Sequence, residues 1–159
     1  PTFRVKAAGS YKQKPGCPSD SVSNLSNERL DYLCAGECYN PSDERYSITR
    51  IEVIKITPQE YRGELIADLI KDVWRTFECS NKDKICEVTF TDTDFIRDSV
   101  YYVRAIQEDT LSINGRQIHM NDRGDVKICK GSYNTDQENN CLFPSSERAW
   151  SSPIFVNKP

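Results

Sequence analysis

The chain has 159 residues, a net charge of −3 and 37% hydrophobic residues, which is the size and composition of one globular domain spanning residues 1–159. The negative balance argues against DNA or RNA as a partner, because nucleic-acid binding needs a basic surface. No apolar run approaches the ~20 residues that a membrane-spanning helix requires, so no membrane span is expected.

The first part of the chain is predicted to hold one strand and one helix joined by loops. Residues 3–7 alternate between apolar and charged side chains, as a short strand does. Residues 11–24 are rich in Pro, Gly, Ser and Lys, which indicates a loop. Residues 27–34 follow a capping serine and precede Gly36, which predicts one short helix.

The middle of the chain gives one clear and one ambiguous prediction. Residues 39–47 contain Asn-Pro and Ser-Asp pairs, which favour turns. Residues 48–56 are rich in β-branched side chains and precede Pro58, which predicts a strand. In residues 64–77 the apolar side chains recur at i, i+1, i+4 and i+5, and this spacing favours an amphipathic helix over a strand.

The second half of the chain is predicted to be mostly strand. Further strands are expected at residues 87–91, 100–106 and 154–156. Asn114-Gly115 is a strong hairpin signal, with flanks at 112–113 and 117–119, and residues 124–140 form a polar excursion. Together these elements predict a mainly β fold: an antiparallel, β-sandwich-like domain stapled by disulfides, with one or two short helices.

Seven cysteines are too many for a typical reduced cytosolic domain of this size. We therefore expect disulfides and a secreted or periplasmic location. The simplest local pairs are Cys79 with Cys86, and Cys129 with Cys141. Cys17, Cys34 and Cys38 then share one bond, so Cys17–Cys34 and Cys17–Cys38 both remain open and one of the three sulfurs is unpaired.

Metal sites are weakly indicated. A closed zinc site needs four ligands, and His119 is the sole imidazole in the sequence. Asp92, Asp94 and Asp98 are candidate calcium ligands, because alternating carboxylates can converge on a hard cation. They lack the turn glycine and distal glutamate of an EF-hand, so a solvated turn is the favoured interpretation. No cofactor is expected in this chain.

No motif assigns a catalytic residue. The sequence contains no serine nucleophile elbow, phosphate-binding glycine loop or metalloprotease helix. Trp74, Tyr101, Tyr102 and Trp150 could form a sugar-stacking face, but packing in the core and across strands is the favoured interpretation.

Three blocks carry a resemblance to a known family. They are Ile48–Lys55, Val100–Glu108 and the closing segment Glu147–Val156, which reads Glu-Arg-Ala-Trp-Ser-Ser-Pro-Ile-Phe-Val. In this order they resemble the C-terminal end of an exported bacterial family of unknown function related to the PHP (polymerase and histidinol phosphatase) metallophosphoesterases. The resemblance implies a β-rich C-terminal part packed behind a metal-binding barrel, and an extended structure after Asp68.

The resemblance also implies that the catalytic His and Asp ligands lie upstream, in the barrel. This chain has one histidine and no His-x-His motif, so no catalytic residue is carried over. We expect the chain, which begins at Pro1 without an initiator methionine, to be the C-terminal part of a larger exported protein. A partner for the odd cysteine would then lie in the upstream part.

Two functions are compatible with these observations. The first is a non-catalytic accessory domain of an exported PHP-like metal-dependent phosphoesterase, with an upstream PHP-like barrel domain or chain as its partner. Trp150, Tyr102 and Arg104 are the candidate interface residues, because aromatic and arginine side chains dominate such contacts. The alternative is an autonomous extracellular binding module for glycan or protein.

Overall fold

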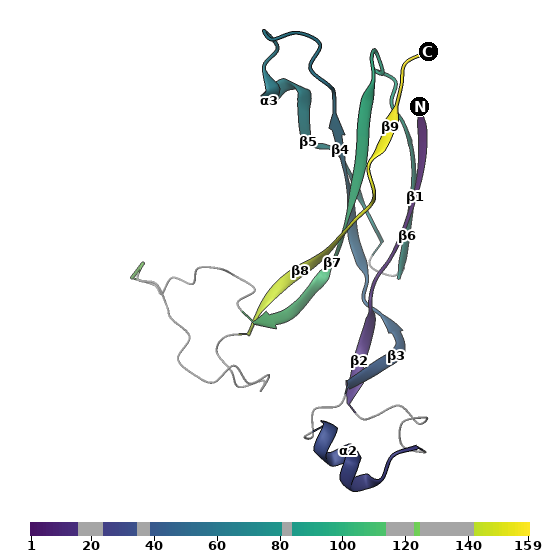
Figure 1. Ribbon diagram of the computed structural model, residues 1–159, viewed down its shortest axis with the longest axis vertical. Coiled ribbons are helices and arrows are strands. Elements are labelled where there is room, and N and C mark those ends of the chain that lie inside the picture. Colours follow the sequence, from purple (N-terminus) through teal and green to yellow (C-terminus); the bar gives the residue numbers. More distant parts are fainter. Residues whose placement is uncertain (16–23, 35–38, 81–83, 114–122, 125–141) are drawn as a thin grey trace.

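The computed structural model describes residues 1–15, 24–34, 39–80, 84–113, 123–124 and 142–159. Within these residues most of the chain is strand, every pairing is antiparallel, and the helices are short (Figure 1). The expectation of a mainly β fold with one or two short helices is confirmed.

The larger sheet has five strands in the order β5-β4-β7-β8, with β9 beside β7. Their bounds are β4 Ile48–Ile56, β5 Ile70–Glu78, β7 Ser99–Ile113, β8 Leu142–Trp150 and β9 Ile154–Val156. β8 and β9 pair with the same edge of β7, β9 at its start and β8 further along. Ser151 links them, because its N–H donates to Val103 O and its hydroxyl accepts from Val103 N.

The smaller sheet pairs β1 (Thr2–Ala8) with β6 (Ile85–Thr91). Its half-buried side chains alternate along β1, as the sequence pattern predicts, and lie against the inner face of the larger sheet. The aliphatic core between the sheets centres on Ile48, Ile51 and Cys86. Val5, Ala7, Cys79, Val88, Val103 and Ala105 pack around it.

Aromatic rings fill one end of the space between the sheets. Phe3 lies 4.6 Å from Tyr101 and Phe77 lies 5.4 Å from Phe90, measured between ring centroids. Trp74 completes the cluster at 6.1 Å from Phe90. These contacts join β1 and β6 to β5 and β7, so the rings hold the two sheets together.

A second two-stranded sheet extends the fold at the end of β1. It pairs β2 (Tyr11–Pro15) with β3 (Tyr39–Arg45), and α2 (Asn27–Cys34) lies between these strands in sequence. Gly9 joins β1 to β2 at a close approach of backbone, because a Cβ at this position would stand 1.9 Å from Tyr46 O.

The structure corrects three local predictions. Residues 11–15 and 39–45 are strands rather than loop and turn, because they satisfy each other's backbone groups at a sheet edge where Pro15 and Pro41 are tolerated. Residues 142–150 form β8, which the sequence analysis did not predict. The helix at 27–34 and the strands at 48–56 and 154–156 are confirmed.

The helix that periodicity favours at residues 64–77 is wrong. Only α3 (Ile66–Leu69) is helical, and β5 then runs from Ile70 to Glu78, as the extended structure expected after Asp68 requires. The physical reason is tertiary, because β5 finds a partner strand in β4 while Trp74 and Phe77 enter the aromatic cluster. The Asn114-Gly115 hairpin lies outside the described residues.

Cys79 and Cys86 form the expected local disulfide. It ties the end of β5 to β6, and so joins one strand of each sheet. Cys17, Cys38, Cys129 and Cys141 lie outside the described residues, as do the pairings expected for them and for Cys34.

Replacing both Cys79 and Cys86 by serine should lower the free energy of unfolding by about 2.5 kcal/mol, because the bond restricts the unfolded chain across a short loop. Urea unfolding followed by circular dichroism, on wild type and double variant under oxidising conditions, measures the difference. An unchanged unfolding midpoint would contradict the assigned role of this bond.

Candidate functional site

A buried ion pair lies between the sheets. Lys55 on β4 and Asp92, directly after β6, approach to 2.5 Å between Nζ and Oδ2, and both side chains are almost fully buried. The Tyr101 hydroxyl on β7 donates to the same oxygen at 2.5 Å. Asp92 Oδ1 accepts from the backbone N–H of Asp94. The carboxylate is therefore occupied on both oxygens by groups of this chain.

The protonation states follow from these contacts. Burial by itself would raise the pKa of Asp92, but the hydrogen bonds from Lys55 and Tyr101 favour the carboxylate, and its pKa lies below the ordinary value. Burial and the neighbouring carboxylate raise the pKa of Tyr101, so its hydroxyl stays a neutral donor. Lys55 also lies 5.3 Å from the centre of the Trp74 ring.

The three candidate calcium ligands occupy different positions. Asp92 is buried in the ion pair, while Asp94 is exposed and Asp98 accepts from the backbone N–H of Lys158. In the described part of the chain, no three His, Cys, Asp or Glu side chains gather as a metal site would require. His119 lies outside that part.

The outer face of the larger sheet, which points away from β1 and β6, carries a row of alternating charges. Glu52 on β4 accepts from Arg50 at 2.8 Å and from Arg104 on β7 at 2.9 Å. Both terminal nitrogens of Arg104 also donate hydrogen bonds to the carboxylate of Asp72 on β5, at 3.3 and 2.6 Å. We call these four residues the polar row, and its forked contacts hold Arg104 in one orientation.

Burial alone would raise the pKa of Glu52. The hydrogen bond from Arg50 and the charge of Arg104 outweigh that effect and hold its pKa below the ordinary value. The carboxylate of Glu52 therefore stays ionised near neutral pH.

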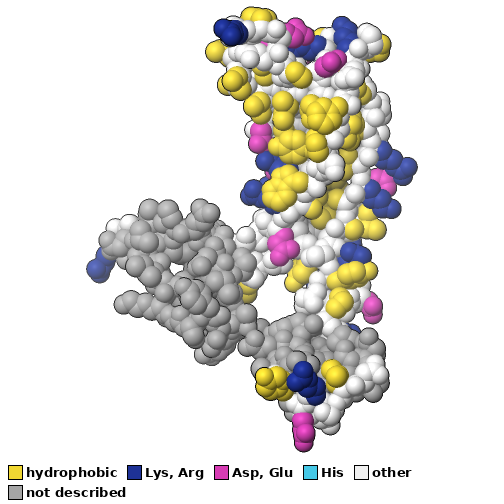
Figure 2. All heavy atoms as spheres, viewed as in Figure 1, with side chains coloured by type: hydrophobic (Ala, Val, Ile, Leu, Met, Phe, Trp, Pro, Cys, Tyr) yellow, Lys and Arg dark blue, Asp and Glu magenta, His cyan; other side chains and the backbone are white. Residues whose placement is uncertain are grey.

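Large apolar side chains flank the polar row. Trp150 on β8 stands opposite Arg104 in the ladder and is 59% exposed, and Phe155 on β9 stands opposite Val100 and is 74% exposed. Ile70, opposite Ile56, is 45% exposed. Hydrophobic side chains gather over the upper part of the molecule, where β4, β5, β7 and β9 lie (Figure 2).

The structure separates residues that the sequence analysis grouped together. Trp74 and Tyr101 lie in the inner aromatic cluster, as core packing predicts. Tyr102 stands opposite Ile54, two residues from Arg104 on β7, so Tyr102, Arg104 and Trp150 share the outer face. The four aromatics therefore form no single sugar-stacking face, whereas the three candidate interface residues do lie together.

Sequence reasoning missed the partners of Arg104. Glu52 and Asp72 lie 52 and 32 residues from Arg104 in the chain, and only the β5-β4-β7 strand order brings the three side chains into one row. The alternation of Arg50 and Glu52 with buried Ile51 and Val53 was the available signal.

Comparison with protein-family models, with curated proteins and with solved structures finds no match to this chain. Among the described residues, no helix has the length and apolar character needed to cross a membrane.

Replacing Asp92 by asparagine should lower the free energy of unfolding by about 3–5 kcal/mol, because Lys55 would keep a buried charge without a counter-charge. The double variant Lys55→Met/Asp92→Leu should recover much of this loss, since it removes both charges. Urea unfolding of the single and double variants measures both values. A single variant as stable as wild type would contradict the importance of this pair.

The ion pair also predicts how stability depends on pH. Because the pKa of Asp92 is lower in the folded than in the unfolded protein, its contribution is complete above the unfolded pKa of about 4 and is lost as the pH falls toward the folded value. As the pH is lowered below about 4, the free energy of unfolding should therefore decrease less steeply in Asp92→Asn than in wild type. Parallel curves would mean that Asp92 titrates normally in the folded protein.

Proposed function

We propose that this chain is a non-catalytic accessory domain of an exported protein, and that it docks on a neighbouring domain or chain through the outer face of its larger sheet. The exposure of Trp150 beside the fixed Arg104 is the observation that carries this proposal. A tryptophan next to an ordered arginine is the combination found at the centres of protein interfaces.

The arrangement of the outer face suits a firm contact. The polar row fixes Arg104 before a partner arrives, so little side-chain entropy remains to be lost on binding. The exposed rings of Trp150 and Phe155, on the two strands that pair with the far edge of β7, supply apolar area beside it. A surface of this kind, an apolar patch with a preorganised polar centre, is typical of an interface.

The partner that we propose is an upstream PHP-like barrel, in the same or a separate chain. This identity rests on the resemblance of the segments 48–55, 100–108 and 147–156 to the end of that exported family. The accessory domain would complete the fold of a metal-dependent phosphoesterase and supply no catalytic group. The disulfide Cys79–Cys86 is compatible with an oxidising location, and we propose secretion or export to the periplasm.

The alternative is an autonomous extracellular module that binds glycan or protein. The exposed rings of Trp150 and Phe155 support it, because sugars and peptides both stack on free aromatic faces. The two functions differ in what covers the outer face in the native protein: a stably attached domain in the first, and a soluble ligand in the second.

Native mass spectrometry of the protein from its source, before and after reduction, separates these functions. The accessory domain should appear joined to, or complexed with, a heavier partner that carries the His-rich motifs of a metal-binding barrel. A lone chain of 18.2 kDa that binds no such partner would refute the accessory role.

A Trp150→Ala variant of the native protein should weaken the attachment at least tenfold, since truncating a central interface tryptophan commonly removes that much affinity. The matched control is Tyr32→Ala, which removes a ring that is 77% exposed on α2, away from the larger sheet. Equal retention of the partner by both variants, measured by native mass spectrometry, would show that the outer face is not the interface.

A further inference from the structure

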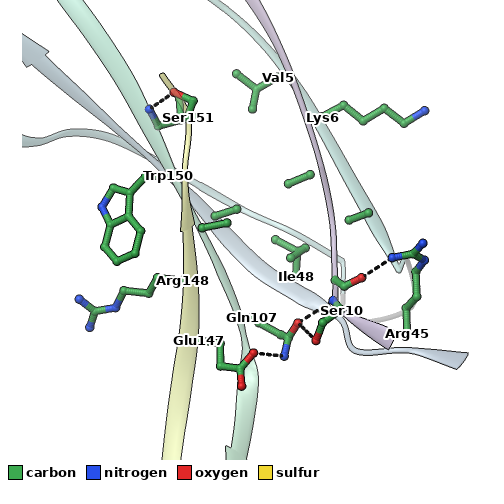
Figure 3. A pocket seen from close by; sticks show the side chains of 16 residues that line it. Val5, Lys6, Ser10, Arg45, Ile48, Gln107, Glu147, Arg148, Trp150 and Ser151 are labelled. Atoms are coloured by element: carbon green, nitrogen blue, oxygen red, sulfur yellow. Dashed lines mark hydrogen bonds between the residues drawn. The ribbon is translucent and has the colours of Figure 1, made fainter. Parts of the chain in front are cut away.

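The two sheets have unequal width, and the uncovered part of the larger sheet forms a groove. This groove lies between β1 and β8, encloses about 460 Å³, and is seen in Figure 3 between Val5 on one side and Trp150 on the other. We call it the edge groove. It is lined by residues 5–10 of the β1 segment, by Arg45 and Ile48, by Val103, Ala105 and Gln107 of β7, and by residues 147–151.

The β1 side of the edge groove is an unpaired strand edge. Among the described residues β1 pairs only with β6. Asp92 N donates to Pro1 O and Gly9 N donates to Lys84 O. The backbone N–H and C=O groups of the odd-numbered residues of β1 therefore point toward β6 and pair with it. The peptide groups of the even-numbered Lys6 and Ala8 therefore point to the other side, toward the groove.

On the β8 side, no described strand pairs with the outer edge of β8. Within the described ranges β8 pairs only with β7, at the end of the larger sheet. Because Ser151 N donates to Val103 O, Ala149 and Ala105 occupy the next hydrogen-bonded rung. The peptide groups of Arg148 and Trp150 alternate with this rung and point away from β7. Two rows of backbone donors and acceptors thus flank one groove.

The floor of the edge groove leaves room for side chains. Ala7 and Ala105 are half-buried there, and Ala8 and Ala149 are exposed, so four of the side chains that line the groove are single methyl groups. At one end Gln107 closes the floor, because its Oε1 accepts from both N–H and hydroxyl of Ser10 at 2.8 and 2.9 Å. Alternate side chains of an incoming strand would fill this space, as a missing strand of a sandwich would.

The charges around the edge groove select the ligand. Its lining includes the cations Lys6, Arg45 and Arg148 and a single carboxylate, Glu147. Neither Lys6 nor Arg148 takes part in an ion pair with a described residue. An acidic ligand would therefore be attracted to the rims. A second copy joined through β1 would instead bring cations against the same cations.

We propose that the edge groove binds an extended, acidic peptide segment of a partner protein by β-strand addition. The peptide hydrogen-bonds to the peptide groups of Lys6 and Ala8 on the open edge of β1, places small apolar side chains on the alanine floor, and directs acidic side chains toward Lys6. A helix cannot occupy this groove in the same way, because its backbone groups are already paired internally.

The probe is a capped peptide of about eight residues that alternates valine with aspartate, long enough to form one strand. Isothermal titration calorimetry should detect binding of this peptide. The matched peptide with lysine in place of aspartate should bind at least tenfold more weakly, because it meets the same rim cations with like charge. Equal binding of the two peptides would overturn the acidic preference.

Hydrogen exchange locates the bound strand. The N–H groups of Lys6 and Ala8 should exchange more slowly with the Val/Asp peptide present, while those of Val5 and Ala7, already paired with β6, should change little. Protection confined to residues of the outer face, such as those around Phe155, would overturn the proposed site and leave the accessory interface as the binding surface.

Two variants test the contacts separately. Lys6→Pro removes the free N–H without touching a β1–β6 hydrogen bond and should weaken binding about tenfold, and Lys6→Glu keeps the N–H but reverses the charge and should weaken it as well. The control Lys71→Glu changes another exposed lysine, on β5 at the opposite edge of the larger sheet, and should leave affinity unchanged.

A second copy of this chain is the alternative occupant of the edge groove, and sedimentation of the wild-type protein alone tests for it. A monomer across the concentration range agrees with the proposal. A dimer that Lys6→Pro converts to monomer would identify a second copy as the occupant of the edge groove and would overturn the peptide assignment. None of these variants changes Trp150, so their outcome is read separately from that of the Trp150→Ala experiment, and the proposed accessory function can fail or stand independently.

Discussion

The carboxylate of Asp92 connects the smaller sheet to the larger sheet through buried polar contacts. It follows β6 of the smaller sheet and accepts from Lys55 and Tyr101 of the larger one, at 2.5 Å in each case. A buried charge without a counter-charge is costly, so the native fold must bring β4, β6 and β7 into this register. The contacts of Trp74 and Phe77 with Phe90 and the Cys79–Cys86 disulfide also connect β6 to the larger sheet, in this case through β5. The Asp92 carboxylate is buried and both of its oxygens are hydrogen-bonded within the chain, which makes it a structural link between the sheets.

The larger sheet has five strands and the smaller sheet has two, and both proposed binding surfaces lie on parts of the larger sheet that the smaller one leaves uncovered. Two strands cover part of the inner face of the larger sheet, and the edge groove is the part left open beside β8. No described strand covers the outer face, where the polar row and the exposed Trp150 lie. We propose different partners for the two surfaces. The outer face would present side chains to a folded domain, and the edge groove would present backbone groups to an extended segment.

The strand β8 contributes both to the outer face and to the edge groove. Its Trp150 side chain stands opposite Arg104 on the outer face, while the alternating peptide groups of Arg148 and Trp150 point along the free edge. This double use follows from strand geometry, in which side chains leave the sheet above and below and peptide groups leave it sideways. A partner on the outer face and a peptide in the edge groove can therefore occupy the same strand through different atoms.

The sequence by itself determined the elements whose pattern is local and strong. The strands at 48–56 and 154–156, the helix at 27–34, and the disulfide between Cys79 and Cys86 all follow from β-branched runs, capping residues and short spacing. The sequence analysis also named Trp150, Tyr102 and Arg104 as candidate interface residues. They share one face because Tyr102 and Arg104 are two residues apart on β7 and Trp150 lies directly opposite Arg104 on β8. The local pattern did not show that residues 70–78 form a strand, which only the family resemblance implied, and the tertiary structure alone decided that residues 142–150 form β8 and that Asp92 faces Lys55. The physical reason is the same in each case: these outcomes depend on a partner strand distant in sequence, and no local pattern of apolar or charged residues contains the identity of that partner.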